Sequence, residues 1–167
     1  MKKIGIFFGS STGQTELVAD KLQQLFGSES ADVVNVDSAT LEDLDHYKYL
    51  VLGTPTWGIG DMQDDWDDFL EELLRADLTK KKVALFGLGD QDTYPESFAD
   101  GMGVLFDRIK GKTKIVGHWP SAGYHFISSD ALRDRKFVGL VIDQENQADQ
   151  TDDRLEKWVK ALKKEFV

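Results

Sequence analysis

The sequence predicts an α/β protein in which helices cover both faces of a five-stranded parallel sheet, giving three layers. Apolar runs of strand length alternate with segments whose apolar residues recur at helical spacing. The strands are apolar nearly throughout, as expected of parallel strands buried on both faces. The 167 residues suit one domain, and no stretch has the composition of a linker, so we expect residues 1–167 to fold as a unit.

The first three strands are expected near the N-terminus. The apolar run Lys3–Phe8 is too short for a signal peptide and favours a first strand. A helix is expected at about 13–26, because Val18, Leu22 and Phe26 share one face. Two further apolar runs predict the second and third strands, at 31–36 and 47–54.

The second half continues the alternation. A helix is indicated by the apolar stripe of Trp66, Phe69, Leu70, Leu73 and Leu74. The fourth strand is expected at 81–89, a helix at about 98–109, the fifth strand from 113 to 119, and a last helix over about 155–166. The segment 117–136 is long and polar-aromatic, and a second strand-like run follows at 137–143. We therefore expect an insertion, at about 117–136, that splits the fifth strand.

Composition limits the possible functions. The formal net charge is −10, which argues against nucleic acid or an anionic membrane as partners, because both need cationic patches. No cysteine is present, which excludes disulfides, thiolate-bound iron–sulfur clusters and thiol catalysis. Any redox chemistry would therefore need an organic cofactor. No stretch has the length of a membrane span, so we expect a cytoplasmic protein.

The loop after the first strand reads GSSTGQT and predicts an anion site. A helix N-terminus offers backbone N–H groups and a positive dipole end, and Gly9 and Gly13 allow close backbone approach. The spacing fits neither a Walker A loop nor a dinucleotide-binding G-x-G-x-x-G. A capping box formed by Ser11 and Gln14, with no ligand, is the structural alternative. The loop has no lysine, so neutral donors would hold a phosphate without cancelling its charge.

Two later loops should lie at the same edge of the sheet, since ligands of doubly wound sheets bind beyond the carboxyl ends of the strands. TPTWGIGD follows the third strand and GLGDQDTYPESFAD follows the fourth. Trp57 and Tyr94 could stack on the two faces of a flat ring, with Gly89 and Asp90 at its edge. A buried packing role for Trp57 is the alternative.

These motifs together identify a resemblance to the long-chain flavodoxins over essentially the whole chain. The resemblance rests on GSSTGQT, TPTWG, GLGDQDTYPESFAD, the late insertion and the closing NQADQTDDRLEKW, which occur in the family's order and spacing. It implies the flavodoxin-like α/β/α sandwich with strand order 2-1-3-4-5. It also implies non-covalently bound FMN, an electron-transfer role without catalysis, and a monomer.

The resemblance assigns the cofactor contacts by position. The FMN phosphate would be held by Ser10, Ser11, Thr12, Gly13, Gln14 and Thr15. Thr54, Pro55 and Thr56 would lie near the phosphate and the ribityl chain. Trp57 and Tyr94 would stack on the isoalloxazine ring. The Gly58–Ile59 peptide would face the ring nitrogen N5, and Gly60, Gly89 and Asp90 would contact the polar edge of the ring. Glu145 or Asn146 would lie near the ribityl chain. Gln14 departs from the lysine of a number of relatives. No residue is expected to bind a metal.

The implied function is a low-potential one-electron carrier that shuttles between semiquinone and hydroquinone. A peptide flip at Gly58 would stabilise the semiquinone, and negative charges near the ring would oppose formation of the anionic hydroquinone. The stretch 61–77 carries eight acids and one arginine. We expect it to dock basic faces of redox proteins, with a flavodoxin or ferredoxin reductase as donor and low-potential enzymes as acceptors. A solvated helix face is the alternative.

Two other classes share this architecture. A response-regulator receiver needs acidic residues after the first strand and an aspartate ending the third, where this chain has Gly9 and Gly53. An FMN-dependent quinone reductase needs one open ring face, which aromatics on both faces would oppose. The insertion could be a partner surface or a cover for the fifth strand.

Overall fold

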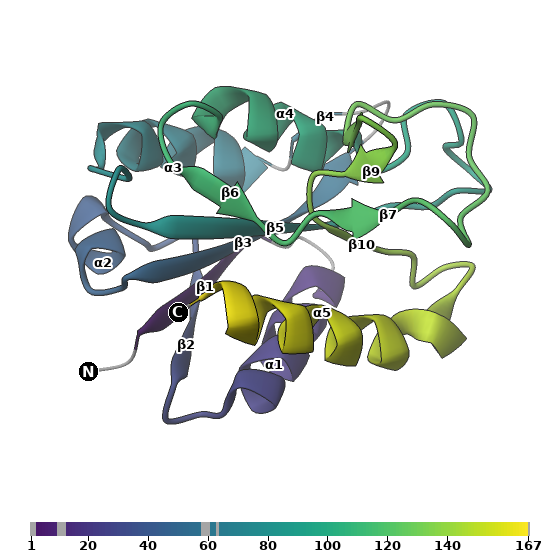
Figure 1. Ribbon diagram of the computed structural model, residues 1–167. Coiled ribbons are helices and arrows are strands. Elements are labelled where there is room, and N and C mark those ends of the chain that lie inside the picture. The colour runs from purple at the N-terminus through teal and green to yellow at the C-terminus, as the bar shows by residue number, and fades with distance from the viewer. Residues whose placement is uncertain (1–2, 10–12, 58–60, 63, 167) are drawn as a thin grey trace.

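The computed structural model describes residues 3–9, 13–57, 61–62 and 64–166, and for residues 57, 61 and 62 it describes the backbone alone. A parallel sheet forms the middle layer (Figure 1). Its strands lie in the order β2-β1-β3-β5, and β5 is followed at the edge by both β6 and β10. Their bounds are β1 Ile4–Phe8, β2 Ala31–Asn35, β3 Tyr49–Trp57, β5 Lys82–Leu88, β6 Lys114–Val116 and β10 Leu140–Ile142.

The split fifth strand is confirmed. β6 pairs with residues 82–84 of β5, and β10 pairs with residues 86–88, both in parallel. The two short strands therefore lie one after the other along the same edge of β5. The predicted order 2-1-3-4-5 is confirmed when β6 and β10 are counted together as the fifth strand.

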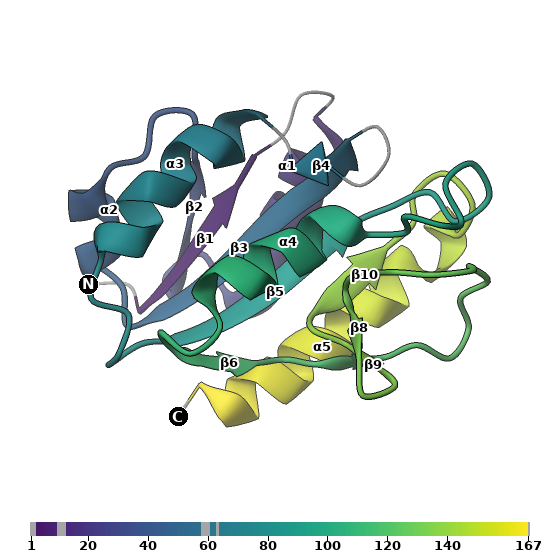
Figure 2. The same ribbon diagram turned by 90° about the horizontal axis from the view of Figure 1, so that it is seen from above.

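Helices cover both faces of the sheet. α1 (Gln14–Phe26) and α5 (Thr151–Glu165) lie on one face, whereas α3 (Asp64–Arg75) and α4 (Asp100–Ile109) lie on the other (Figures 1 and 2). A short 3₁₀ turn, Ala148–Gln150, leads into α5. The sequence pattern did not predict α2 (Leu41–Asp45), which is too short to show helical periodicity.

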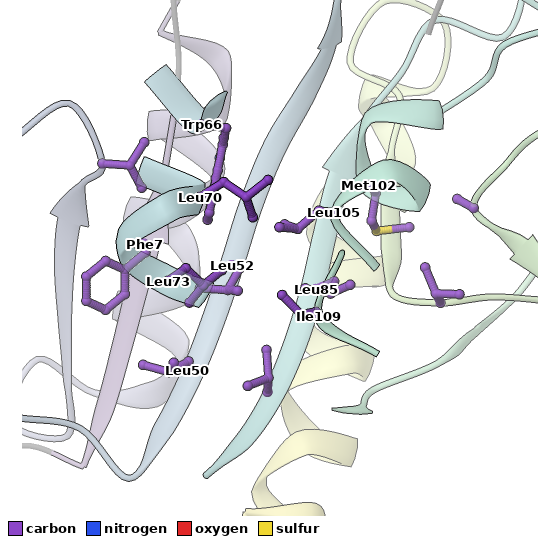
Figure 3. Packing of buried hydrophobic residues seen from close by; sticks show 14 of the residues in the cluster. Phe7, Leu50, Leu52, Trp66, Leu70, Leu73, Leu85, Met102, Leu105 and Ile109 are labelled. Carbon is purple, nitrogen blue, oxygen red and sulfur yellow. The ribbon is translucent and has the colours of Figure 1, made fainter. Parts of the chain in front are cut away.

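Each face has its own apolar core. On the α3 and α4 side, strand residues such as Phe7, Leu52 and Leu85 pack against side chains of the two helices (Figure 3). The stripe expected on α3 is confirmed, since Trp66, Phe69, Leu70 and Leu73 are buried and Leu74 packs against the same cluster. On the other face, the cluster joins β-strand residues to apolar side chains of α1 and α5. The sheet is therefore buried on both sides, as its apolar sequence predicts.

Several expected boundaries differ from the structure. The two pieces of the fifth strand are shorter than the expected 113–119 and 137–143, since β6 ends at Val116 and β10 begins at Leu140. β3 continues through Trp57, so TPTW is strand rather than loop, and the two-residue strand β4 (Asp61–Met62) pairs with its end in antiparallel. Phe98 precedes α4 instead of lying in it. The insertion also contains a small antiparallel sheet of β7 (Trp119–Pro120), β9 (Lys136–Phe137) and β8 (Leu132–Arg133). Such short strands are paired by contacts distant in sequence, which local patterns do not reveal.

Candidate cofactor-binding site

A cleft of about 220 Å³ lies at the carboxyl edge of the sheet. It is bordered by the first turn of α1, the end of β3 and the loops that follow β5 and β10. The described lining residues are Gln14, Thr15, Pro55, Thr56, Leu88, Gly89, Asp90, Tyr94, Ser97, Ala99 and Glu145. Most come from the three loops that the sequence singled out.

The first turn of α1 forms one wall. Gly13 is its N-cap and has a φ of 88°, a left-handed conformation that glycine adopts without strain. Thr15 is buried, and the Gln14 side-chain amide donates a hydrogen bond of 3.1 Å to Glu145 Oε1. This bond joins α1 to the loop after β10. The first-turn amides and the helix dipole favour an anion here.

The end of β3 contributes Pro55 and Thr56. The Thr56 hydroxyl accepts a 3.0 Å hydrogen bond from the Gly101 amide at the start of α4, which fixes the strand end against that helix. Thr54 is fully buried, and its hydroxyl donates to the Pro55 carbonyl at 3.0 Å. Thr54 is not among the described lining residues of the cleft, and its place near the phosphate and ribityl chain, which the family resemblance implies, stays a prediction.

The loop after β5 forms the opposite wall. A Cβ on Gly89 would lie 2.9 Å from the Phe98 ring and 3.0 Å from the Ala99 amide nitrogen, so only glycine fits without a shift. Asp90 closes the turn that follows, because its carbonyl accepts from the Tyr94 amide at 2.9 Å. Tyr94 lines the cleft and is 44% exposed. Its ring is therefore available to a ligand.

The described lining is negative. It contains two carboxylates, Asp90 and Glu145, and neither lysine nor arginine. Partial burial acts to raise the pKa of Asp90, but hydrogen bonds from the Thr93 amide and the Asn146 side chain outweigh it and lower that pKa. Asp90 is therefore ionised at neutral pH.

Several expected contacts fall outside the described residues. These are Ser10, Ser11 and Thr12 in the first loop, and Gly58, Ile59 and Gly60 after β3. Of Trp57 only the backbone is described, at the end of β3. Three lining residues were not singled out from the sequence, namely Leu88, Ser97 and Ala99. Leu88 is the last residue of β5, and the carboxyl end of this strand was expected to border the site. Its position at the strand end is therefore the sequence signal that could have identified it.

Other features of the described chain offer weaker candidates. A hollow of about 330 Å³ lies at the amino-terminal ends of the strands, lined by aromatic and lysine side chains, and contains none of the expected contacts. Among the described residues, no group of three or more histidine, aspartate or glutamate side chains could hold a metal. No helix in the described ranges has the length and apolar character needed to cross a membrane.

The fold and the cleft define a class: doubly wound α/β proteins that bind a ligand at the carboxyl edge of a parallel sheet. The flavodoxin family model matches residues 6–158, so the chain belongs to the flavodoxin family. Flavodoxins are electron-transfer proteins, and this chain is accordingly an electron carrier rather than an enzyme.

Individual relatives agree. The chain is 46% identical to a Nostoc flavodoxin over 166 residues, covering 99% of this chain and 98% of that protein. It is 49% identical to flavodoxin 1 of Escherichia coli over 164 residues, covering 97% and 93% of the two chains. A solved Fusobacterium nucleatum flavodoxin bound to flavin mononucleotide has a TM-score of 0.93 at 34% identity, with both chains covered completely.

Proposed function

We propose that this chain is a low-potential one-electron carrier that binds FMN non-covalently in the cleft at the carboxyl edge of the sheet. The observation that carries the proposal is the combination of an exposed aromatic ring, Tyr94, with a lining that holds two carboxylates and no described cation. The first feature suits a flat ring. The second opposes the addition of negative charge to it.

The described residues fit FMN part by part. Leu88 and Pro55 give an apolar floor, and the backbone at Gly89 and Asp90 offers polar groups to a ring edge. The first turn of α1, which begins at Gly13, suits a phosphate. We assign the remaining phosphate and ring contacts to residues 10–12 and 57–60 on the strength of the family resemblance. Bound FMN supplies a ring that accepts and releases electrons one at a time.

The carboxylates are expected to keep the potential low. Asp90 is ionised and its position is fixed by hydrogen bonds from Thr93 and Asn146. Glu145 also lines the cleft, and its Oε1 accepts a hydrogen bond from the Gln14 side chain. An electron added to the ring raises the negative charge near these groups, and Coulomb repulsion disfavours that addition.

We further propose that the solvent face of α3 docks basic redox proteins, a pyridine-nucleotide reductase as donor and low-potential enzymes as acceptors. The buried stripe of α3 turns the other side of the helix outward, where Asp64, Asp67, Asp68 and Glu71 are exposed. The net charge of −10 would steer a basic partner towards the molecule, and an acidic face beside the cleft would orient it.

The cofactor proposal is tested by reducing the purified, FMN-loaded protein stepwise without oxygen and recording its visible spectrum. We expect two separate one-electron steps, the second at a much lower potential. The variant E145Q should raise the second potential by on the order of tens of millivolts, and E156Q, on the solvent face of α5, should leave it unchanged. A single two-electron step with turnover of a quinone would overturn the carrier assignment, and a colourless protein that does not take up FMN would overturn the cofactor.

The docking proposal is tested by the rate of electron transfer from a basic flavodoxin reductase at low and high salt. D68K and E156K change the net charge equally, but they lie on opposite faces of the sheet. We expect D68K to slow association severalfold at low salt and E156K to have a much smaller effect. Equal slowing by the two variants would show that only net charge matters.

A further inference from the structure

Asp143 is a fully buried carboxylate that lies outside the proposed cofactor contacts. It follows β10 directly and has no exposed surface. Its Oδ2 accepts hydrogen bonds from the Gln91 amide nitrogen at 3.0 Å and from Gln91 Nε2 at 2.7 Å. Its Oδ1 accepts from the Asn146 amide nitrogen at 3.0 Å. A buried carboxyl group with this many hydrogen-bond donors strongly favours one arrangement of the segments that supply them.

Gln91 is fixed at both ends of its side chain. It is only 3% exposed, and while its Nε2 donates to Asp143, its Oε1 accepts from the His125 amide nitrogen at 2.5 Å. Gln91 thus connects three segments that are distant in sequence: the loop after β5, the loop after β10 and the insertion. It follows Asp90 directly, so its position sets the position of the cleft wall.

The same network reaches the cleft on the Asn146 side. Asn146 Nδ2 lies 3.0 Å from Asp143 Oδ2 and donates to Asp90 Oδ1 at 2.8 Å. Asp90 in turn accepts from the Thr93 and Tyr94 amides, each at 2.9 Å. A continuous chain of hydrogen bonds therefore runs from the buried carboxylate to the residue that carries the exposed ring.

We propose that Asp143, acting through Gln91 and Asn146, is a positioning residue that holds the loop 89–94 in the conformation that receives the ring of the cofactor. This inference rests on the proposed FMN site and identifies the part of the fold that shapes one wall of it. Asp143 itself does not line the cleft. Its effect is to keep Asp90 and Tyr94 in place before the cofactor arrives.

The test uses the variant Q91L, which keeps the approximate size of the side chain and removes both of its hydrogen bonds. T151V is the matched control, because Thr151 is equally buried and its hydroxyl donates at 2.7 Å to Gln144 in the same loop after β10, a bond that is not part of the chain reaching Asp90. Dissociation constants of the cofactor-free proteins are measured with FMN and with riboflavin, which has the same ring but no phosphate.

We expect Q91L to weaken binding of FMN and riboflavin by the same factor, about tenfold, and T151V to leave both constants unchanged. A tenfold loss corresponds to a loop that adopts the receiving conformation about a tenth of the time. Amide hydrogen exchange at residues 90–94 should become faster in Q91L and stay unchanged in T151V. Exchange reports the loop directly, without a cofactor present.

Other outcomes would overturn the inference. Riboflavin binding by Q91L within a factor of two of the wild type would show that the loop needs no support from Asp143. A loss seen with FMN alone would place the effect at the phosphate. If Q91L does not fold, amide hydrogen exchange in cofactor-free N146A decides, because this variant leaves the Asp143–Gln91 pair intact and removes the Asn146–Asp90 hydrogen bond. Exchange at residues 90–94 should become faster, and unchanged exchange would refute the proposal. Failure of the wild type to bind FMN would instead refute the proposed function.

Discussion

The substitution Y124F tests how the insertion is attached to the sheet. Tyr124 lies in the insertion and is 8% exposed. Its hydroxyl donates to the Val141 carbonyl of β10 at 2.5 Å and accepts from Trp119 Nε1 at 3.1 Å. The Arg154 guanidinium lies 4.0 Å from the centre of its ring. The side chain thus connects the insertion to an edge strand and to α5.

The magnitude has two parts. Phenylalanine keeps the ring and its cation–π contact but leaves the Val141 carbonyl without this donor, which should cost about 1–3 kcal/mol of unfolding free energy at pH 7. The second part depends on pH, since burial raises the pKa of Tyr124 to about 12 from its ordinary value of 10.0. Desolvation of the phenolate by burial is the main cause.

The sign follows from proton binding. Between pH 10 and pH 12 the unfolded chain releases the Tyr124 proton while the folded chain keeps it, so stability falls as the pH rises. For these two pKa values the loss is about 1.4 kcal/mol by pH 11. Phenylalanine has no such proton. The stability gap between wild type and Y124F should therefore narrow by that amount between pH 8 and pH 11.

The assay is urea unfolding of the cofactor-free proteins, followed by far-UV circular dichroism at pH 8 and pH 11. Y94F is the control, because Tyr94 is 44% exposed and its replacement should leave stability nearly unchanged at pH 8. The slope of free energy against urea should be equal in all three proteins. A gap that stays constant from pH 8 to pH 11 would refute the argument from burial, and no gap at pH 8 would refute the argument from the hydrogen bond.

Three further substitutions test packing and charge. G101A should cost about 1–3 kcal/mol of stability in urea unfolding and weaken FMN binding, because its Cβ would lie 2.7 Å from the Pro55 carbonyl oxygen at the cleft; unchanged binding would contradict the proposed role of this contact. G139A should cost more than about 3 kcal/mol, since its Cβ would lie 2.0 Å from a backbone carbonyl oxygen of β5, and a stable folded variant would refute this packing. D107N should cost less than about 1 kcal/mol of stability at pH 7, because Asp107 is 43% exposed. Hydrogen bonding from Arg133 lowers the pKa of Asp107 to about 2, so the stability that Asp107 adds is present above pH 4 and lost as the pH falls towards 2. A stability difference between wild type and D107N that persists at pH 2 would contradict the Asp107–Arg133 ion pair.

The sheet could be predicted from the sequence because its signal is local and repeated. Each central strand is a continuous apolar run, and each long helix carries an apolar stripe, as in β5 and α3. The split strand was also predictable, since two apolar runs flank a polar-aromatic segment. The short α2 was not predicted, although its start carries a helix-capping signal. The carboxylate of Asp43, three positions after the N-cap Thr40, accepts a hydrogen bond of 2.9 Å from the Thr40 amide.

From the residues alone, the candidate site could be located only to the loops that follow the parallel strands. Loops that follow neighbouring parallel strands must meet at one edge, so the sequence alone is enough to place Gly89, Asp90 and Tyr94 near the other two loops. The prediction that Thr54 lies near the phosphate and the ribityl chain came from the family resemblance and stays a prediction. Alternation along β3 turns its side chain into the protein, where it is fully buried, while the neighbouring Pro55 lines the cleft.

The Asp143 network lay beyond sequence reasoning for a related reason. An aspartate after an apolar strand looks like an ordinary solvated turn residue, and Gln91 has no distinctive spacing. Only the fold shows that Gln91 and Asp143, which are 52 positions apart in the sequence, form a hydrogen bond of 2.7 Å. The contacts that the cofactor would make are thus encoded in local loop motifs. The support that keeps those loops in place comes instead from a buried carboxyl group whose hydrogen-bond partners are brought to it by the fold. Substitutions in the two sets should accordingly be separable, the first changing ring or phosphate binding selectively and the second changing how often the wall of the cleft is formed.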